Sequence, residues 1–240
     1  MKRILLLLFI FYTLTAYTQQ AAEKKLPWDY PVKPGTEAWE QLTNRREAIE
    51  VCQIPEDVLS SLSTENLTEI CLQYPLLLDV FTPISYERGL DIVFERFNGI
   101  RELFKRKDAA KELLRQYQAK MQNLSHLEGN DSDLQKGFFI LSIASLELLL
   151  SRYHSTEGVQ NKLYTEILKQ LVDGHEKKLA YADYFQGIEF TNFFSRAHMI
   201  GKIDEQNLKQ IPQKVFLQRR LDEATERTIN ELSYQLIKEK

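Results

Sequence analysis

Apolar residues along most of this chain recur at intervals of three and four positions, which is the spacing of one face of an α-helix. The clearest example is the run Leu90, Val93, Phe97, Ile100 and Phe104. Comparable stripes predict helices after residue 108 and from residue 217 toward the C-terminus. No alternation of apolar and polar residues is long enough to predict a strand. The pattern therefore predicts an all-α protein.

Proline and glycine positions divide the chain into an arm and a helical domain. Three prolines and Gly35 fall within residues 19–35, and this density forbids a helix and predicts an extended arm. Residues 36–240 form the predicted helical domain, which begins with Thr36 as the N-cap of a helix through Val51. Farther on, the spacing predicts a helix from Thr156 that ends at Asp173-Gly174.

Short helices joined by proline-marked corners are typical of αα-hairpins. The segment from Gly137 to Leu150 is apolar almost all round, which predicts a central helix covered on several sides. The polar segment 125–133 is the clearest loop, and a boundary between two lobes would fall there. We expect an irregular array of helix pairs. It could form two lobes or a short stack that resembles a solenoid.

The first 18 residues have the pattern of a secretory signal peptide. Met1-Lys2-Arg3 precedes an apolar run from Ile4 to Phe11, and small residues follow, so we expect cleavage between Ala16 and Ala22. The run is shorter than the ~20 residues that cross a bilayer, and no later segment predicts a span in the mature chain. The sequence predicts export to the periplasm, the outer surface or the medium.

The charge balance excludes one class of partner. The chain has 31 basic and 34 acidic residues, and removal of Lys2 and Arg3 with the leader leaves a net charge of −5. A nucleic-acid-binding protein needs a basic surface, so we expect no nucleic-acid partner.

A single carboxylate within the apolar central helix is the first candidate for chemistry. A buried carboxyl group without a partner is the usual state of a catalytic acid. Glu147 could instead pair with Arg152 or Arg196, which is the structural alternative. With His198, Glu147 and Arg196 are the residues from which a cell-envelope hydrolase would assemble its site. No second carboxylate shares the helix face, so we favour the structural role and lean against an enzyme.

No metal or cofactor motif is present in the sequence. The four histidines lack the i,i+4 spacing that places two imidazoles on one helix face. The acidic segment at Asp131 and Asp133 lacks the glycine and glutamate that a calcium loop needs, and it is better suited to cap the next helix. We expect no metal and no cofactor.

Aromatic residues form the most unusual local pattern. The same spacing of three aromatic residues occurs twice, first at Tyr181, Tyr184 and Phe185 and again at Phe190, Phe193 and Phe194. Exposed rings at these positions could stack against a sugar or a peptide, whereas the same spacing is also that of a packed helix face. The candidate binding residues are Tyr181, Tyr184, Phe190, Phe193, Trp28 and Trp39.

The two cysteines, Cys52 and Cys71, are 19 positions apart. In an exported protein they could form a disulfide that closes a small helical corner. The alternative is a pair of small buried apolar residues.

Three stretches share a pattern with known sequences: Tyr30–Trp39, Cys52–Pro75 (CQIPEDVLSSLSTENLTEICLQYP) and Phe97–Leu114 (FNGIRELFKRKDAAKELL). Together they resemble a group of exported helical proteins from Bacteroides-type bacteria that has no assigned activity. The resemblance implies export and a helical N-terminal half. The resemblance does not identify a catalytic residue in this chain.

The sequence favours a secreted or periplasmic helical scaffold that binds a peptide or another partner of the cell envelope. The hydrolase and an aromatic platform for carbohydrate remain the two alternatives. A buried, paired Glu147 would favour the scaffold, whereas convergence of Glu147, His198 and Arg196 on one open cavity would favour the hydrolase.

Overall fold

The structure is a computed structural model that describes residues 26–83, 85–153, 162–203, 209–217 and 221–238. These ranges contain twelve α-helices, three 3-10 helices and no strand, which confirms the all-α prediction. In the N-terminal half the elements are α2 (Glu37–Glu40), α3 (Arg45–Val51), α4 (Glu56–Ser61), α5 (Thr64–Leu72), η1 (Leu77–Phe81), α6 (Tyr86–Arg96) and α7 (Asn98–Leu103). In the C-terminal half they are α8 (Ala109–Gln122), η2 (Leu124–Glu128), α9 (Asp133–Ser151), α10 (Lys162–Leu179), η3 (Ala182–Phe185), α11 (Phe190–Ile203), α13 (Lys214–Leu217) and α14 (Glu223–Lys238).

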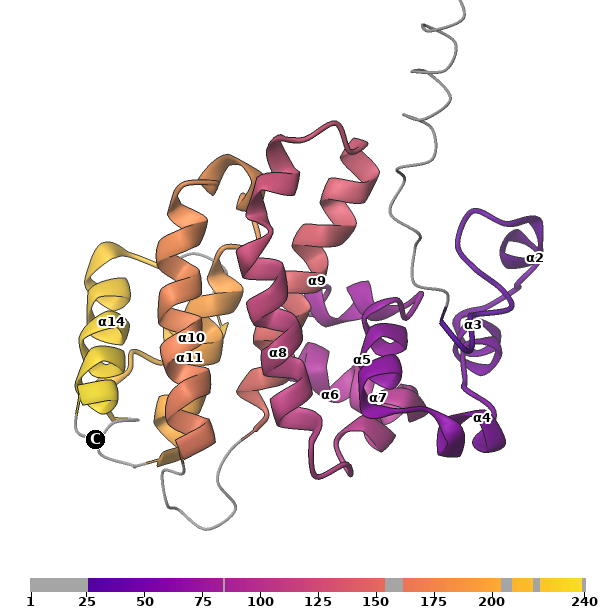
Figure 1. Cartoon of the computed structure of the whole chain (residues 1–240), viewed down its shortest axis with the longest axis horizontal. Coiled ribbons are helices and arrows are strands. Elements are labelled where there is room, and N and C mark those ends of the chain that lie inside the picture. The colour runs from indigo at the N-terminus through magenta and orange to yellow at the C-terminus, as the bar shows by residue number, and fades with distance from the viewer. Residues whose placement is uncertain (1–25, 84, 154–161, 204–208, 218–220, 239–240) are drawn as a thin grey trace, which may run out of the picture.

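The helices follow one another across the molecule from α2 at one end to α14 at the other (Figure 1). The long helix α9 lies in the middle, where it packs against α8 and α11, and α14 covers α10 and α11. Buried apolar residues form one continuous cluster that includes residues on both sides of segment 125–133. The core therefore extends from the N-terminal helices to α14.

Several helices begin where the sequence places an N-cap. The side chains of Thr36, Ser63 and Ser85 each accept a hydrogen bond from the backbone N–H three residues later. At the start of α9, Ser132 and Gln135 form a reciprocal capping box. These bonds satisfy N–H groups that the first helical turn leaves without partners.

The predicted continuous helix from Thr36 to Val51 is wrong, because the chain forms two helices there. Asn44 accepts from the backbone N–H of Glu47 and starts α3, while the Glu47 carboxylate accepts from both the backbone and the hydroxyl of Thr43. This local cap competes with helix continuation, and the apolar spacing across it gave no sign of the break.

The break between α6 and α7 places a polar side chain against the preceding corner of the chain. Phe97 has an extended backbone, and Asn98 then bonds both the N–H (3.0 Å) and the carbonyl (2.7 Å) of Ile54. Gln53 completes the contact by accepting from the backbone N–H of Asn98 at 3.1 Å. The segments around Ile54 and Asn98 are thus locked together although 44 positions separate them.

The proline-rich arm packs against the helical domain from Leu26 onward. Tyr30 is buried, and its hydroxyl donates to the carbonyl of Ile70 at 2.9 Å. Its ring meets Trp28 edge to face at 4.7 Å between centroids. Beneath it, Tyr74 and Phe97 stack at 4.0 Å. The aromatic residues of the arm therefore extend the core.

One predicted helix end is also wrong. The helix predicted to stop at Asp173-Gly174 continues as α10 to Leu179. Its predicted start at Thr156 lies outside the described residues.

A close approach of backbone to backbone fixes α6 on η1. A Cβ at Gly89 would lie 2.1 Å from the carbonyl oxygen of Val80, whereas a Cβ at Gly137 of α9 would meet nothing within 4 Å. Both glycines are helical, so they provide a matched pair in which the space around the residue is the main difference.

We expect Gly89→Ala to lower the free energy of unfolding by about 2–3 kcal/mol, because the new methyl group forces η1 away from α6. Gly137→Ala should leave it unchanged or raise it by up to ~1 kcal/mol through lower unfolded-state entropy. Urea unfolding followed by circular dichroism measures both variants. Equal effects would contradict the close approach.

Candidate functional site

Glu147 is the one acidic residue among the buried side chains of the described chain, and it lies in the middle of α9. From Ile140 onward α9 is covered on all sides except at Leu141, and the Glu147 side chain has no solvent exposure. Removing a carboxylate from water is costly unless hydrogen bonds and an opposite charge replace the water. The surroundings of Glu147 must therefore supply both.

Four donors from three other helices surround this carboxylate. Its Oε1 accepts from Tyr117 Oη of α8 at 3.0 Å, from Lys178 Nζ of α10 at 2.7 Å and from Asn192 Nδ2 of α11 at 2.9 Å. Its Oε2 accepts from Thr191 Oγ1 of α11 at 2.6 Å. We call Glu147, Tyr117, Lys178, Thr191 and Asn192 the carboxylate cluster. It joins α8, α9, α10 and α11 at one point.

Gly174 makes this cluster possible. A Cβ at position 174 would lie 2.0 Å from the Tyr117 hydroxyl oxygen, so only glycine lets that hydroxyl pass α10 and reach Glu147. This contact explains why a glycine that resembles a helix end sits inside α10. Burial, together with the charge of Glu147, raises the pKa of Tyr117 well above its usual value, so the phenol remains a hydrogen-bond donor.

Arg196 is, after Lys178, the second buried cation near Glu147, but Arg196 and Glu147 do not pair directly as the sequence suggested. Its Nη1 donates to Asn230 Oδ1 at 2.8 Å, and its guanidinium lies 4.8 Å from the ring centroid of Phe193. The ion pair to Glu147 comes from Lys178, and the other suggested partner, Arg152, pairs with Asp91. Burial lowers the pKa of Arg196 to about 10, so it stays charged at neutral pH.

His175 of α10 lies beside these cations. Its ring meets Phe193 at 4.6 Å between centroids. Burial lowers the pKa of His175 to about 4, and the charges of Arg196 and Lys178 act in the same direction. The imidazole is therefore neutral at pH 7.

The three residues of the predicted hydrolase site do not converge on one cavity. His198 stacks on Phe194 at 5.7 Å, and Phe194 in turn contacts Tyr86 and Phe216. His198 is two positions from Arg196, so the two side chains leave α11 on different faces. Glu147 is sealed and engaged by four donors, which leaves it without access to a substrate.

The predicted aromatic platform is mostly part of the core. Phe193 is buried, Tyr181 and Phe190 are half-buried against the core, and Tyr184 alone of the four is exposed, at 38%. Trp28 and Trp39 are likewise partly buried against the core. One exposed ring does not make a stacking surface.

Cys52 and Cys71 are both fully buried free thiols in this structure. Burial raises the pKa of Cys52 to about 11 and moves that of Cys71 still farther above its usual value. Both are thus protonated at neutral pH, and neither has the lowered pKa of a reactive thiol.

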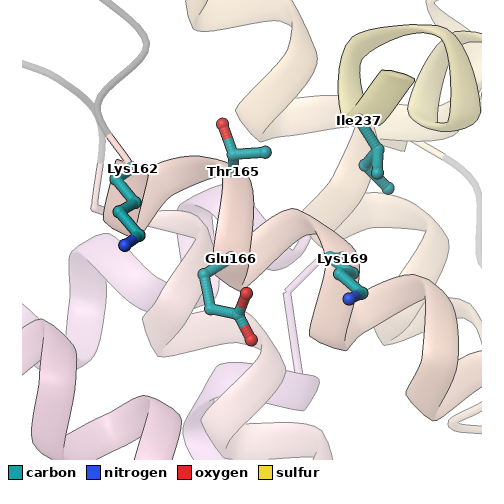
Figure 2. Close-up of a pocket in the computed structure, with 5 residues that line it drawn as sticks. All are labelled: Lys162, Thr165, Glu166, Lys169 and Ile237. Atoms are coloured by element: carbon teal, nitrogen blue, oxygen red, sulfur yellow. The ribbon is translucent and has the colours of Figure 1, made fainter. Parts of the chain in front are cut away.

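A shallow depression of about 380 Å³ lies between α10 and α14. Lys162, Thr165, Glu166 and Lys169 line it along one face of α10, and Ile237 contributes from α14. Figure 2 shows these side chains spread along the helix without converging on a common point. The depression contains none of the candidate residues predicted from the sequence and offers no evident chemistry.

An uncovered apolar face of α9 is a feature that the sequence analysis missed. Leu134 is 69% exposed and Phe138 is 64% exposed, and Leu141 continues their line with partial exposure. Farther along the same line Ser145 and Leu148 are buried. In Figure 1 the first half of α9 extends beyond the group of α5, α6 and α7. We call Leu134, Phe138 and Leu141 the α9 face.

The spacing 134, 138, 141, 145 and 148 could have indicated one continuous helix stripe. It could not indicate where the covering helices end, because that depends on how α5 and α6 pack. The sequence predicted a central helix from Gly137 to Leu150 that is covered on several sides. Residues from Ile140 onward are covered in this way, whereas Phe138 is exposed, and the helix begins earlier, at Asp133, so that it also carries the exposed Leu134.

Two further observations bear on metal and membrane binding. Within the described residues no group of three or more His, Cys, Asp or Glu side chains is arranged to hold a metal ion. By length and composition α9 is the one described helix that could cross a membrane, and 56% of that stretch is buried inside the protein. A core helix of a soluble protein has the same properties.

Comparison with known proteins adds no relative: no family model, no curated protein and no solved structure matches this chain. The site must therefore be interpreted from its own chemistry.

We expect Glu147→Gln to lower the free energy of unfolding by about 3–5 kcal/mol, because it leaves the Lys178 ammonium buried without a counter-charge. The double variant Glu147→Gln/Lys178→Met should recover part of that loss. Glu166→Gln, which alters a partly exposed carboxylate on α10, is the matched control and should change stability by less than ~0.5 kcal/mol. Chemical unfolding measures all three, and a Glu147→Gln change as small as the control would contradict a sealed ion pair.

We expect stability to fall as the pH decreases from about 6.5 to about 4. In this window the unfolded chain binds a proton at His175 that the folded chain does not, because the folded-state pKa is the lower one. The His175 contribution should be roughly 2 kcal/mol, after allowance for its partial solvent exposure. Thermal unfolding across this range should show a smaller decline in His175→Asn than in the parent protein.

Proposed function

We propose that this protein is an exported helical scaffold that binds a protein or peptide partner of the cell envelope through the α9 face. The observation that carries the proposal is the exposure of Leu134 and Phe138 on a helix whose next turns form the centre of the core. The apolar N-terminal run, with its preceding Lys2 and Arg3, supports export.

The energetics favour a surface that is covered in use. Burying a leucine or phenylalanine side chain contributes about 1.5–3 kcal/mol, so covering Leu134 and Phe138 would supply several kcal/mol to a complex. Of the other large apolar side chains of the described chain, only Leu78, Leu179, Tyr184 and Tyr234 are exposed. Large aromatic and aliphatic residues at the centre of an interface typically dominate its binding energy.

The carboxylate cluster supports the same function by fixing the helix that carries the face. Glu147 holds α9 to α8, α10 and α11 about two and a half turns from Phe138. A rigid helix loses little conformational entropy on binding, which favours affinity. The cluster thus serves as support for a binding surface and takes no part in contact with the partner.

A hydrolase is less well supported, because Glu147 and Arg196 are sealed in the core and His198 lies on another face of α11. A carbohydrate platform is also less well supported, because of the four predicted rings only Tyr184 is exposed.

A photoreactive amino acid at Leu134 should form a discrete covalent adduct with the partner in cells that export the protein. The same residue at Leu179, which is 62% exposed on α10, is the matched control and should form none. With the partner identified and purified, Phe138→Ser should weaken binding at least tenfold, or about 1.4–3 kcal/mol, without lowering stability by more than ~0.5 kcal/mol. Equal adducts from positions 134 and 179 would overturn the proposal.

A further inference from the structure

The charged residues that directly precede the α9 face along the chain, from residue 128 to residue 133, are all acidic. Glu128 at the end of η2, Asp131 in the following turn and Asp133 at the start of α9 are all exposed. Among the described residues none of the three forms a salt bridge. We call Glu128, Asp131 and Asp133 the acidic rim.

Neither of the lysines closest to this rim in the sequence, Lys120 and Lys136, forms a salt bridge with it among the described residues. Lys136 lies on the opposite side of α9 from Leu134, with its Nζ 6.0 Å from the ring centroid of Tyr184. Lys120 Nζ lies 5.5 Å from the ring centroid of Phe139. Burial lowers the pKa of Lys120, while the charge of Glu69 acts in the opposite direction. Both cations are therefore engaged with the body of the protein.

We infer that the occupant of the α9 face is a basic amphipathic helix of a partner protein; this inference rests on the proposed function. Leu134, Phe138 and Leu141 span two helical turns, roughly 10 Å, which suits a helix that presents apolar residues at positions i, i+3 or i+4, and i+7. Lysine or arginine residues that flank this apolar stripe would meet Glu128, Asp131 and Asp133 at the rim of the interface.

Charge complementarity also separates this occupant from the alternatives. An anionic membrane surface would bring lipid phosphates toward three unpaired carboxylates, and an acidic helix would do the same. A second copy of this chain would bring its own acidic rim to the interface. Of these occupants, only a basic helix would be bound favourably both by the apolar stripe and by the acidic rim.

The test uses three peptides of about 18 residues, or five helical turns, with the same leucine face. Their polar positions are filled with lysine, glutamine or glutamate. Fluorescence anisotropy measures their binding to the purified protein at about 50 mM and about 300 mM salt. We expect the lysine peptide to bind at least tenfold more tightly than the glutamine peptide at low salt, the glutamate peptide to bind most weakly, and the differences to shrink at high salt.

Variants of the protein assign the binding to the surface. Phe138→Ser should weaken the binding of the lysine peptide and of the glutamine peptide to the same extent. Leu179→Ser, the matched control, should weaken the binding of neither peptide. The double variant Asp131→Asn/Asp133→Asn should weaken binding of the lysine peptide about fivefold and leave binding of the glutamine peptide unchanged. Thermal unfolding of each variant checks that α9 still forms.

The outcomes distinguish the inference from the function on which it rests. Equal binding of the lysine and glutamine peptides, both lost in Phe138→Ser, would overturn the basic partner and keep the apolar docking function. Absence of binding by all three peptides, or binding that ignores Phe138→Ser, would overturn both. Binding to vesicles that contain anionic lipid, or dimer formation that Phe138→Ser abolishes, would replace the basic helix with a membrane or a second copy.

Discussion

The carboxylate of Glu147 needs a complete set of donors once it leaves water, and this requirement sets the arrangement of the C-terminal helices. Tyr117, Lys178 and Asn192 reach its Oε1 from three helices, and Thr191 supplies its Oε2. Apolar contacts do not require one particular donor at one particular position, whereas this carboxylate does. A shift of one residue in α8, α10 or α11 would break at least one hydrogen bond to Glu147, and a shift of α10 would also leave the Lys178 ammonium without its counter-charge.

This arrangement divides α9 into two parts with different roles. The part around Glu147 is enclosed, while the first half of the helix extends past α5, α6 and α7 (Figure 1), and its side chains Leu134 and Phe138 are exposed. The same residue types along one stripe thus serve as core in one half and as an exposed surface in the other. The proposed binding function rests on the exposed half, because the enclosed half has no access to a ligand.

Much of the fold was predictable from local sequence signals. The caps at Thr36, Ser63 and Ser85 follow from side chains that bond the next turn, and the all-α class follows from apolar spacing. The site was predictable only in part. Glu147 stood out as a charge in an apolar helix, but its partner Lys178 lies 31 positions away and depends on tertiary packing. Gly174 resembled a helix end because the sequence does not show that Tyr117 passes it.

The docked arm has a further consequence for the thiols beneath it. Tyr30 lies near Cys52 and Cys71, and its hydroxyl donates to the carbonyl of Ile70, which precedes Cys71 on α5. A disulfide forms by attack of a thiolate, and both sulfurs here are protonated and shut away from solvent. If the chain passes through an oxidising compartment, Cys52 and Cys71 stay reduced only when the arm docks before they meet an oxidant. Rapid docking would preserve two reduced cysteines in a place where free thiols are seldom kept.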